Sequence, residues 1–398
     1  MYRRYKIISL IVIIAINYSA SIIGATVNYD NVKLNRAEIE LKQEELISVG
    51  ILIFDPNVPE GDSTKTLVFP DIRKAEARYF PYHLKNTLEE SGYWGGIWVL
   101  PDSTKSTDLV ITGRIDKSDG YDVTMRVGAW DISGKQWIDK SYSARIAGSA
   151  YSKTRDLTQD PYQSVFNQIA NDLLEIKNKL SSTYLKRVNE IGDLRFASEL
   201  LPGVYNDYLI QEDKTGIFEP IRLPSSEDQM MIRIKEVKER ELLLLDTLNE
   251  YYAQLYQELS VPYGEWRRAN RQNAITYEDL KRSAKKRQIL GAVALIGGLM
   301  VDSDSNTGRY AQQGLMMGGI QAVQTGFAKA SEAKIYRNSM EEGASVLNAT
   351  AEGLVIEVEG QTLRLSGNAQ EMFSGWKQLL AQIYSEETGL DIPKTSSE

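Results

Sequence analysis

The chain of 398 residues contains no cysteine and only one histidine, His83. The absence of cysteine excludes disulfides, thiolate zinc sites, thiol nucleophiles and the lipid anchor of a lipoprotein. A single histidine excludes both a histidine metal cluster and a Ser-His-Asp triad, so we expect His83 to serve packing or to lie at the surface. Counting residues does not exclude carboxylate chemistry, but no carboxylate pair can be singled out from the sequence. We expect no catalytic residue, no cofactor and no metal site.

Positive charge is also in deficit, because the formal net charge is −8. This balance argues against general nucleic-acid binding, although it permits a local basic patch. The apolar share of 42% and the charged share of 25% are ordinary for a folded protein. The length allows two or three domains with substantial cores.

The N-terminus has the pattern of a secretory signal peptide. Three basic residues in the first six positions precede an apolar stretch at 7–16, and small residues at 19–21 follow. We expect cleavage after Ser21, with Ala25 as a second position, and therefore export to the periplasm. An uncleaved membrane anchor stays open, because no charge occurs from 7 to 25.

An α+β domain is predicted from 47 to 185, after a polar leader at 28–46. A buried strand at 49–54, a helix at 72–90 and a second strand at 97–100 come first. Period-two alternation then predicts three antiparallel strands at 108–117, 121–131 and 135–146. A helix from Pro161, continuing to Leu201, closes the unit. The predicted fold class is thus α+β, with the order β-α-β-β-β-α and a mixed sheet.

This order resembles an exported domain shared by the curli secretion lipoprotein, the N-terminal domain of TolB and the lipoprotein activators of penicillin-binding proteins. The residues that carry the resemblance are Val49–Phe54, the helix end Leu88–Gly92 and the strand Asp108–Ile115, which reads Asp-Leu-Val-Ile-Thr-Gly-Arg-Ile. The resemblance implies a domain that binds partners or assembles, without catalytic residues. Many such proteins are lipoproteins, whereas this chain has no cysteine.

The second half, 186–351, is predicted to be helical. A loop rich in proline and glycine runs to Ser226, and a helix follows at 229–259, where Leu and Tyr residues spaced 3 and 4 apart suggest a coiled-coil-like seam or an ordinary bundle helix. Pro262-Tyr-Gly264 is expected to break it. Further helices are predicted at 265–301 and 310–351. A last unit at 352–390 combines a β-hairpin at 354–365 with a helix at 369–386.

A glycine-zipper hairpin is predicted at 281–330. Thirteen residues at 289–301 lack any polar side chain, and small residues recur every four positions in the next arm. Glycine destabilises a helix by about 1 kcal/mol relative to alanine, so close packing must compensate. The residues expected to mediate association are Gly291, Ala294, Gly298, Gly314, Gly318, Ala322, Gly326 and Ala330.

A basic run precedes the hairpin and could contact lipid headgroups or be a solvated helix face. It comprises Lys281, Arg282, Lys285, Lys286 and Arg287, with Arg267, Arg268 and Arg271 earlier. Thirteen helical residues rise about 20 Å, against about 30 Å of hydrocarbon, so a complete crossing is not expected.

The sequence therefore predicts a non-enzymatic scaffold or assembly protein of the cell envelope. It would act through partner binding and self-association, with membrane contact left open. The alternative is a membrane-inserting subunit of a secretion or transport complex that uses the glycine-rich hairpin. The third possibility is an enzyme with paired carboxylates, such as a glycan hydrolase.

Overall fold

The computed structural model describes residues 32–39, 41–42, 45–59, 68–146, 150, 160–300, 355–358 and 361–364, and the single positions Phe373, Gly375, Lys377, Tyr384 and Ser385. For 291–300, 355–358 and 361–364 it describes the backbone alone. The predicted signal peptide, the predicted second arm of the glycine hairpin and the helix predicted at 310–351 lie outside these residues.

A five-stranded mixed sheet forms the centre of an α+β fold, as the sequence predicts. Its order is β2-β1-β3-β4-β5, with β1 parallel to β2 and β3 and the remaining pairs antiparallel. The strands are β1 (Val49–Leu52), β2 (Ile97–Leu100), β3 (Leu109–Ser118), β4 (Asp122–Asp131) and β5 (Gln136–Arg145). Gly120 and Gly134 adopt positive φ at the two turns that join β3 to β4 and β4 to β5.

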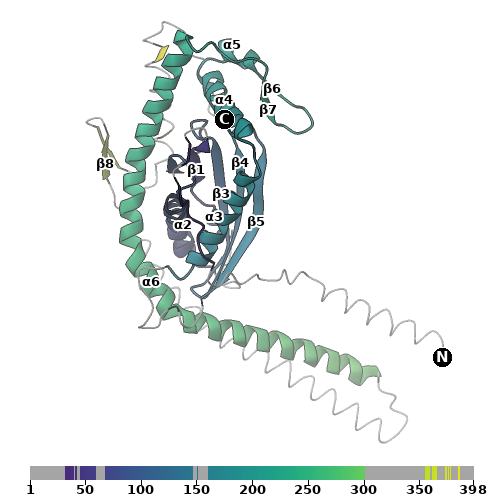
Figure 1. Cartoon of the computed structure of the whole chain (residues 1–398). Coiled ribbons are helices and arrows are strands. Elements are labelled where there is room, and N and C mark those ends of the chain that lie inside the picture. Colours follow the sequence, from purple (N-terminus) through teal and green to yellow (C-terminus); the bar gives the residue numbers. More distant parts are fainter. Residues whose placement is uncertain are drawn as a thin grey trace, which may run out of the picture.

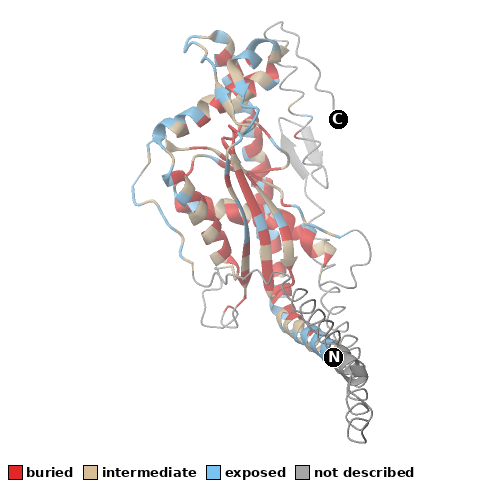
Figure 2. Ribbon diagram, turned by 90° about the vertical axis from the view of Figure 1, so that its right-hand side faces the viewer, coloured by how far each residue is buried: buried red, intermediate tan, exposed pale blue. Residues whose placement is uncertain are grey.

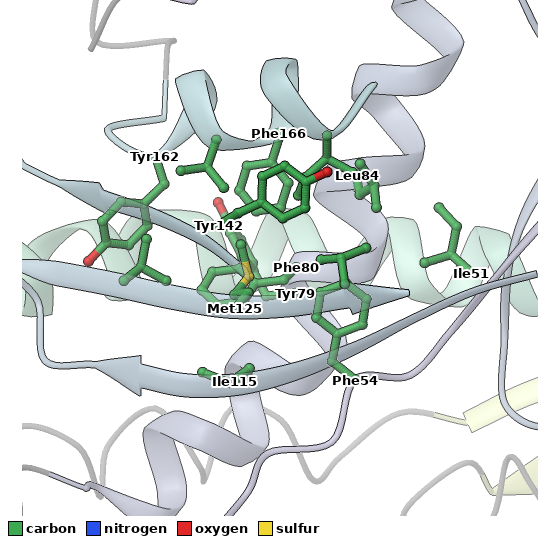
Figure 3. Close-up of a cluster of buried hydrophobic side chains, with 14 of the residues drawn as sticks. Ile51, Phe54, Tyr79, Phe80, Leu84, Ile115, Met125, Tyr142, Tyr162 and Phe166 are labelled. Carbon is green, nitrogen blue, oxygen red and sulfur yellow. The ribbon is translucent and has the colours of Figure 1, made fainter. Parts of the chain in front are cut away.

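Two helices pack on one face of this sheet and form the main core with it (Figure 2). They are α2 (Pro70–Ser91) and α3 (Gln163–Asn178). Alternate residues of β3 and β4 point into this core because side chains alternate along a strand. In Figure 3, aromatic side chains of α2 and α3 lie beside Met125 and Tyr142 of the sheet.

The predicted single helix from Pro161 to Leu201 is wrong, because the chain breaks after α3. Ser181 begins a separate helix, α4 (Ser182–Leu200), and its side chain accepts a hydrogen bond from the Tyr184 amide. Serine is a favoured cap because it satisfies an otherwise unpaired helical amide. The domain boundary predicted at 185 therefore falls inside α4.

The predicted loop up to Ser226 contains short elements. They are α5 (Pro202–Tyr205), the 3-10 helix Asn206–Tyr208, and the paired strands β6 (Leu209–Gln211) and β7 (Phe218–Pro220). The predicted C-terminal hairpin is confirmed as β8 (Val355–Val358) paired with β9 (Gln361–Arg364).

The largest correction concerns α6 (Gln229–Met300), a continuous helix of 72 residues. Pro262 lies inside it and does not end it. A proline within a helix removes one backbone hydrogen bond and costs about 3 kcal/mol. Buried side chains on both sides, Leu259 and Tyr263, hold the helix against the domain and offset that cost. α6 changes direction along its length (Figure 1), and a proline inside a helix is a common cause of such a bend.

Candidate association site

Helix α6 closes the edge of the sheet through one asparagine. The Asn249 side-chain oxygen accepts a hydrogen bond from the Val99 amide at 2.8 Å, and its nitrogen donates to the Val99 carbonyl at 3.1 Å. Val99 lies in β2, an edge strand. The side-chain amide thus replaces a neighbouring strand, which protects an edge that would otherwise be available for pairing. The predicted seam of Leu245, Leu248 and Tyr252 packs against β2 in this region.

A buried carboxylate anchors α6 to the loop that follows β2. Glu241 accepts hydrogen bonds from the hydroxyls of Thr104 and Ser106, the second at 2.8 Å. Burial raises the pKa of Glu241 above its usual value, although the two hydroxyls partly oppose the shift. One turn earlier, Lys238 pairs with Asp193 of α4 at 3.0 Å. The first third of α6 is therefore fixed to two other elements.

The only histidine lies in an aromatic cluster between α2 and α6. His83 Nδ1 and the Tyr256 hydroxyl are 2.6 Å apart, and the rings of Tyr79 and Tyr256 stack with centroids 4.5 Å apart. Burial lowers the pKa of His83, which favours a neutral imidazole. No group of three His, Cys, Asp or Glu side chains suited to a metal ion occurs within the described part of the chain. His83 serves packing, in line with the expectation.

Beyond the proline, α6 is bound to α2 by a buried carboxylate. The Tyr263 hydroxyl donates to Glu76 at 2.5 Å, and Ser118, the last residue of β3, donates to the same oxygen. Burial raises the pKa of Glu76, an effect opposed chiefly by nearby Arg73. Arg73 itself donates to the backbone carbonyl of Ile115. This contact joins the helix after its bend to both α2 and the sheet.

One turn further along α6, a buried ion pair joins it to the segment that precedes α3. Both terminal nitrogens of Arg267 bind Asp160, at 2.9 and 2.8 Å, and both side chains are almost fully buried. Burial alone would raise the pKa of Asp160, but the Arg267 guanidinium outweighs it and holds that pKa well below its usual range. Arg267 is therefore not part of an exposed basic surface, contrary to the sequence-based grouping.

The contacts between α6 and the α+β domain end soon after this pair. Lys117 approaches Glu278 at 3.5 Å, and Tyr277 belongs to the main core. From this point the helix projects away from the sheet (Figure 1). The predicted basic run lies here, and all five of its side chains are exposed: Lys281, Arg282, Lys285, Lys286 and Arg287.

The structure describes only part of the predicted glycine zipper. Gly291, Ala294 and Gly298 lie on the helical backbone of α6, as predicted. Gly314, Gly318, Ala322, Gly326 and Ala330 lie outside the described residues. In the described part of the chain, no helix combines the length and the apolar character needed to cross a membrane.

Sequence reasoning missed the residues that orient α6. Tyr256, Tyr263 and Arg267 are spaced seven and four apart, which places them on one helix face. This spacing was a usable signal, but a helix break assumed at Pro262 assigned Tyr256 and Arg267 to different helices. Asp160 carried no signal, because its partner lies 107 positions away.

Searches with protein-family models, against curated proteins and against solved structures found no significant match to this chain. The resemblance of residues 47–185 to the exported TolB-like domain thus stays a prediction.

Proposed function

We propose that this chain is a non-enzymatic scaffold or assembly protein of the cell envelope, which acts in the periplasm through partner binding and self-association. The α+β domain is its body, and α6 is an arm that presents the glycine-rich hairpin. The observation that carries the proposal is the division of α6. Buried polar contacts bind its first part to the domain as far as Arg267, whereas side chains beyond Glu278 are mostly exposed.

The buried polar contacts of Tyr263 and Arg267 support an arm with a fixed direction. A flexible tether would need no buried partners, yet Tyr263 and Arg267 each meet a carboxylate within the core. Breaking a buried ion pair leaves an uncompensated charge and typically costs about 3–5 kcal/mol. The helix therefore resists rotation and detachment at the bend, which suits a part that presents a surface at a set position.

The roles of the buried carboxylates support a non-enzymatic reading. Glu76, Asp160 and Glu241 each join α6 to another element through a hydrogen bond or an ion pair. Perturbed carboxylates of this kind also occur in catalytic sites, so the distinction rests on what they contact. Turnover of a glycan substrate by the purified chain would contradict the proposal.

The second candidate function is that of a membrane-inserting subunit of a secretion or transport complex. It is favoured by the exposure of Ile289 and Leu290 next to an apolar helical stretch that reaches Met300. Membrane association that resists carbonate extraction after signal cleavage would favour this candidate over the first.

Site-specific crosslinking in an envelope extract tests the main proposal. Because the chain has no cysteine, Gly314→Cys and Gly318→Cys each create a unique attachment point for a crosslinker. We expect crosslinks to a second copy or to one envelope protein. Ala269→Cys, on an exposed position of the anchored part of α6, is the matched control and should give none. Recovery of soluble monomer alone from both glycine positions would contradict the proposal.

A further inference from the structure

Beyond its last contacts with the domain, one face of α6 carries cationic side chains followed by aliphatic ones. Lys281, Lys285 and Ile289 are spaced four apart, and Arg282, Lys286 and Leu290 form a parallel row with the same spacing. Residues four apart lie above one another on a helix, so the two rows share one side. Along this side the side chains change from cationic to aliphatic toward the C-terminal end of the helix.

This face points away from the rest of the described molecule. Ile289 is 53% exposed and Leu290 is 65% exposed, and the four cations are exposed as well. The other side of the helix holds the buried Ala284. At the start of the face, the Lys281 ammonium lies over the ring of Tyr277, one turn earlier, 5.5 Å from its centroid. Exposed aliphatic side chains at the end of a cationic row are not explained by packing within this domain.

The charge of the segment differs sharply from that of the whole chain. Residues 281–300 carry five cations and no Asp or Glu, although the chain as a whole is at −8. Among the described residues, no carboxylate forms an ion pair with any of these five side chains. A local cationic field of this kind attracts an anionic surface.

We propose that this face, defined by Lys281, Arg282, Lys285, Lys286, Ile289 and Leu290, binds the surface of an anionic phospholipid bilayer. The cations would contact the headgroup phosphates, and the two aliphatic side chains would enter the hydrocarbon. This inference rests on the proposed role of α6 as an arm and assigns that arm a lipid partner.

The axial dimensions fit this arrangement. The cationic band from Lys281 to Lys286 rises about 8 Å, close to the about 5–8 Å of one headgroup layer. Ile289 to Met300 is helical and without polar side chains, and it rises about 17 Å, which is slightly more than one leaflet of about 15 Å. The geometry suits insertion into one leaflet.

The aliphatic end of the face favours lipid over other anionic partners. A nucleic acid would be bound by the cations and by stacking groups, but it offers no environment for Ile289, Leu290 and the apolar turns that follow. A bilayer offers both phosphate and hydrocarbon, in the order in which the helix presents cations and aliphatic side chains.

Vesicle flotation of the full chain tests the proposal. We expect binding to vesicles containing about 30% phosphatidylglycerol, weak binding to pure phosphatidylcholine, and loss of binding at high salt. Replacing the four cations by glutamine should weaken binding by at least about a hundredfold, since each surface cation is worth about fivefold. The matched control removes four exposed cations elsewhere: Lys33→Gln, Lys186→Gln, Lys214→Gln and Arg233→Gln. It should keep most of the affinity.

A fluorescent probe tests the insertion. Leu290→Cys labelled with an environment-sensitive dye should brighten and shift to the blue with anionic vesicles, whereas labelled Ala269→Cys should not change. Equal binding by the glutamine variant and its control overturns the proposal, as does an unchanged signal at 290. Retention of the chain by a DNA duplex or by polyaspartate but not by vesicles also overturns it.

The vesicle experiments and the crosslinking experiment can fail independently. If the chain does not bind vesicles but still forms crosslinks at positions 314 and 318, the lipid proposal is wrong and the scaffold proposal stands. If the chain binds vesicles but forms no such crosslink, the lipid proposal stands and self-association is wrong.

Discussion

The two parts of α6 contain similar side chains in opposite circumstances. Arg267 is buried and paired with Asp160, whereas Lys281 lies exposed about four turns further along the same helix. Before the bend and just after it, polar residues fix the helix to the domain. Beyond Glu278, polar residues face outward. The comparison teaches that a run of cations along one helix can divide into a structural part and an interaction part, according to what lies opposite.

The largest expected effect comes from the buried pair. Asp160→Asn leaves the Arg267 charge without its partner inside the core, so we expect the free energy of unfolding to fall by about 3–5 kcal/mol. Urea denaturation of the full chain measures this. The matched control is Asp139→Asn, which breaks the exposed ion pair with Arg126 and should leave the unfolding midpoint unchanged. Equal midpoints for the two variants would show that the joint is not anchored as described.

The second largest loss of stability is expected from the contact between Asn249 and the edge strand β2. Asn249→Ala removes both hydrogen bonds to the Val99 backbone and leaves a buried amide unsatisfied, which costs about 2 kcal/mol. Hydrogen exchange at the Val99 amide should accelerate in this variant. Gln254→Ala, which changes an exposed residue of the same helix, provides the control. Unchanged exchange at Val99 would mean that another group protects the edge of β2.

The single histidine predicts a pH dependence of smaller size. Burial places the folded-state pKa of His83 below the usual 6.5. Its contribution to stability is therefore present above pH 6.5 and is lost as pH falls below 6.5 toward the folded-state pKa, by at most about 1.4 kcal/mol per pH unit. His83→Gln should flatten the unfolding free energy between pH 6.5 and 5. An identical slope in both proteins would assign the effect to carboxylates.

The smallest effect is expected beyond Glu278. Ile289→Ser changes a side chain that is 53% exposed, so the free energy of unfolding should stay within about 0.5 kcal/mol of the parent. Thermal unfolding followed by circular dichroism is sufficient to measure it. A loss comparable to that of Asn249→Ala would mean that Ile289 is packed in the folded protein.

The strands of the sheet and their succession along the chain could be predicted from the sequence because period-two alternation is a local signal. The alternate positions Ile111, Gly113 and Ile115 identify the core-facing side of β3 from the local sequence alone. The C-terminal hairpin was predictable for the same reason. The apolar and basic character of the distal part of α6 is also visible in the sequence alone.

The anchors could not be predicted because each depends on two distant segments. Glu76 meets Tyr263 across 187 positions, and Asn249 meets Val99 across 150. The continuity of α6 was missed for a related reason. The low helix propensity of proline predicts that the helix ends at Pro262. The buried side chains around Pro262 stabilise the helix through tertiary packing, and this packing outweighs the propensity.

Sedimentation velocity of the full chain tests the central claim, that the distal part of the arm drives association while the anchored part only positions it. Gly314→Leu combined with Gly318→Leu should convert an associated species to monomer and leave the free energy of unfolding of the α+β domain unchanged. An association state that is the same in the parent and in this variant would contradict the account.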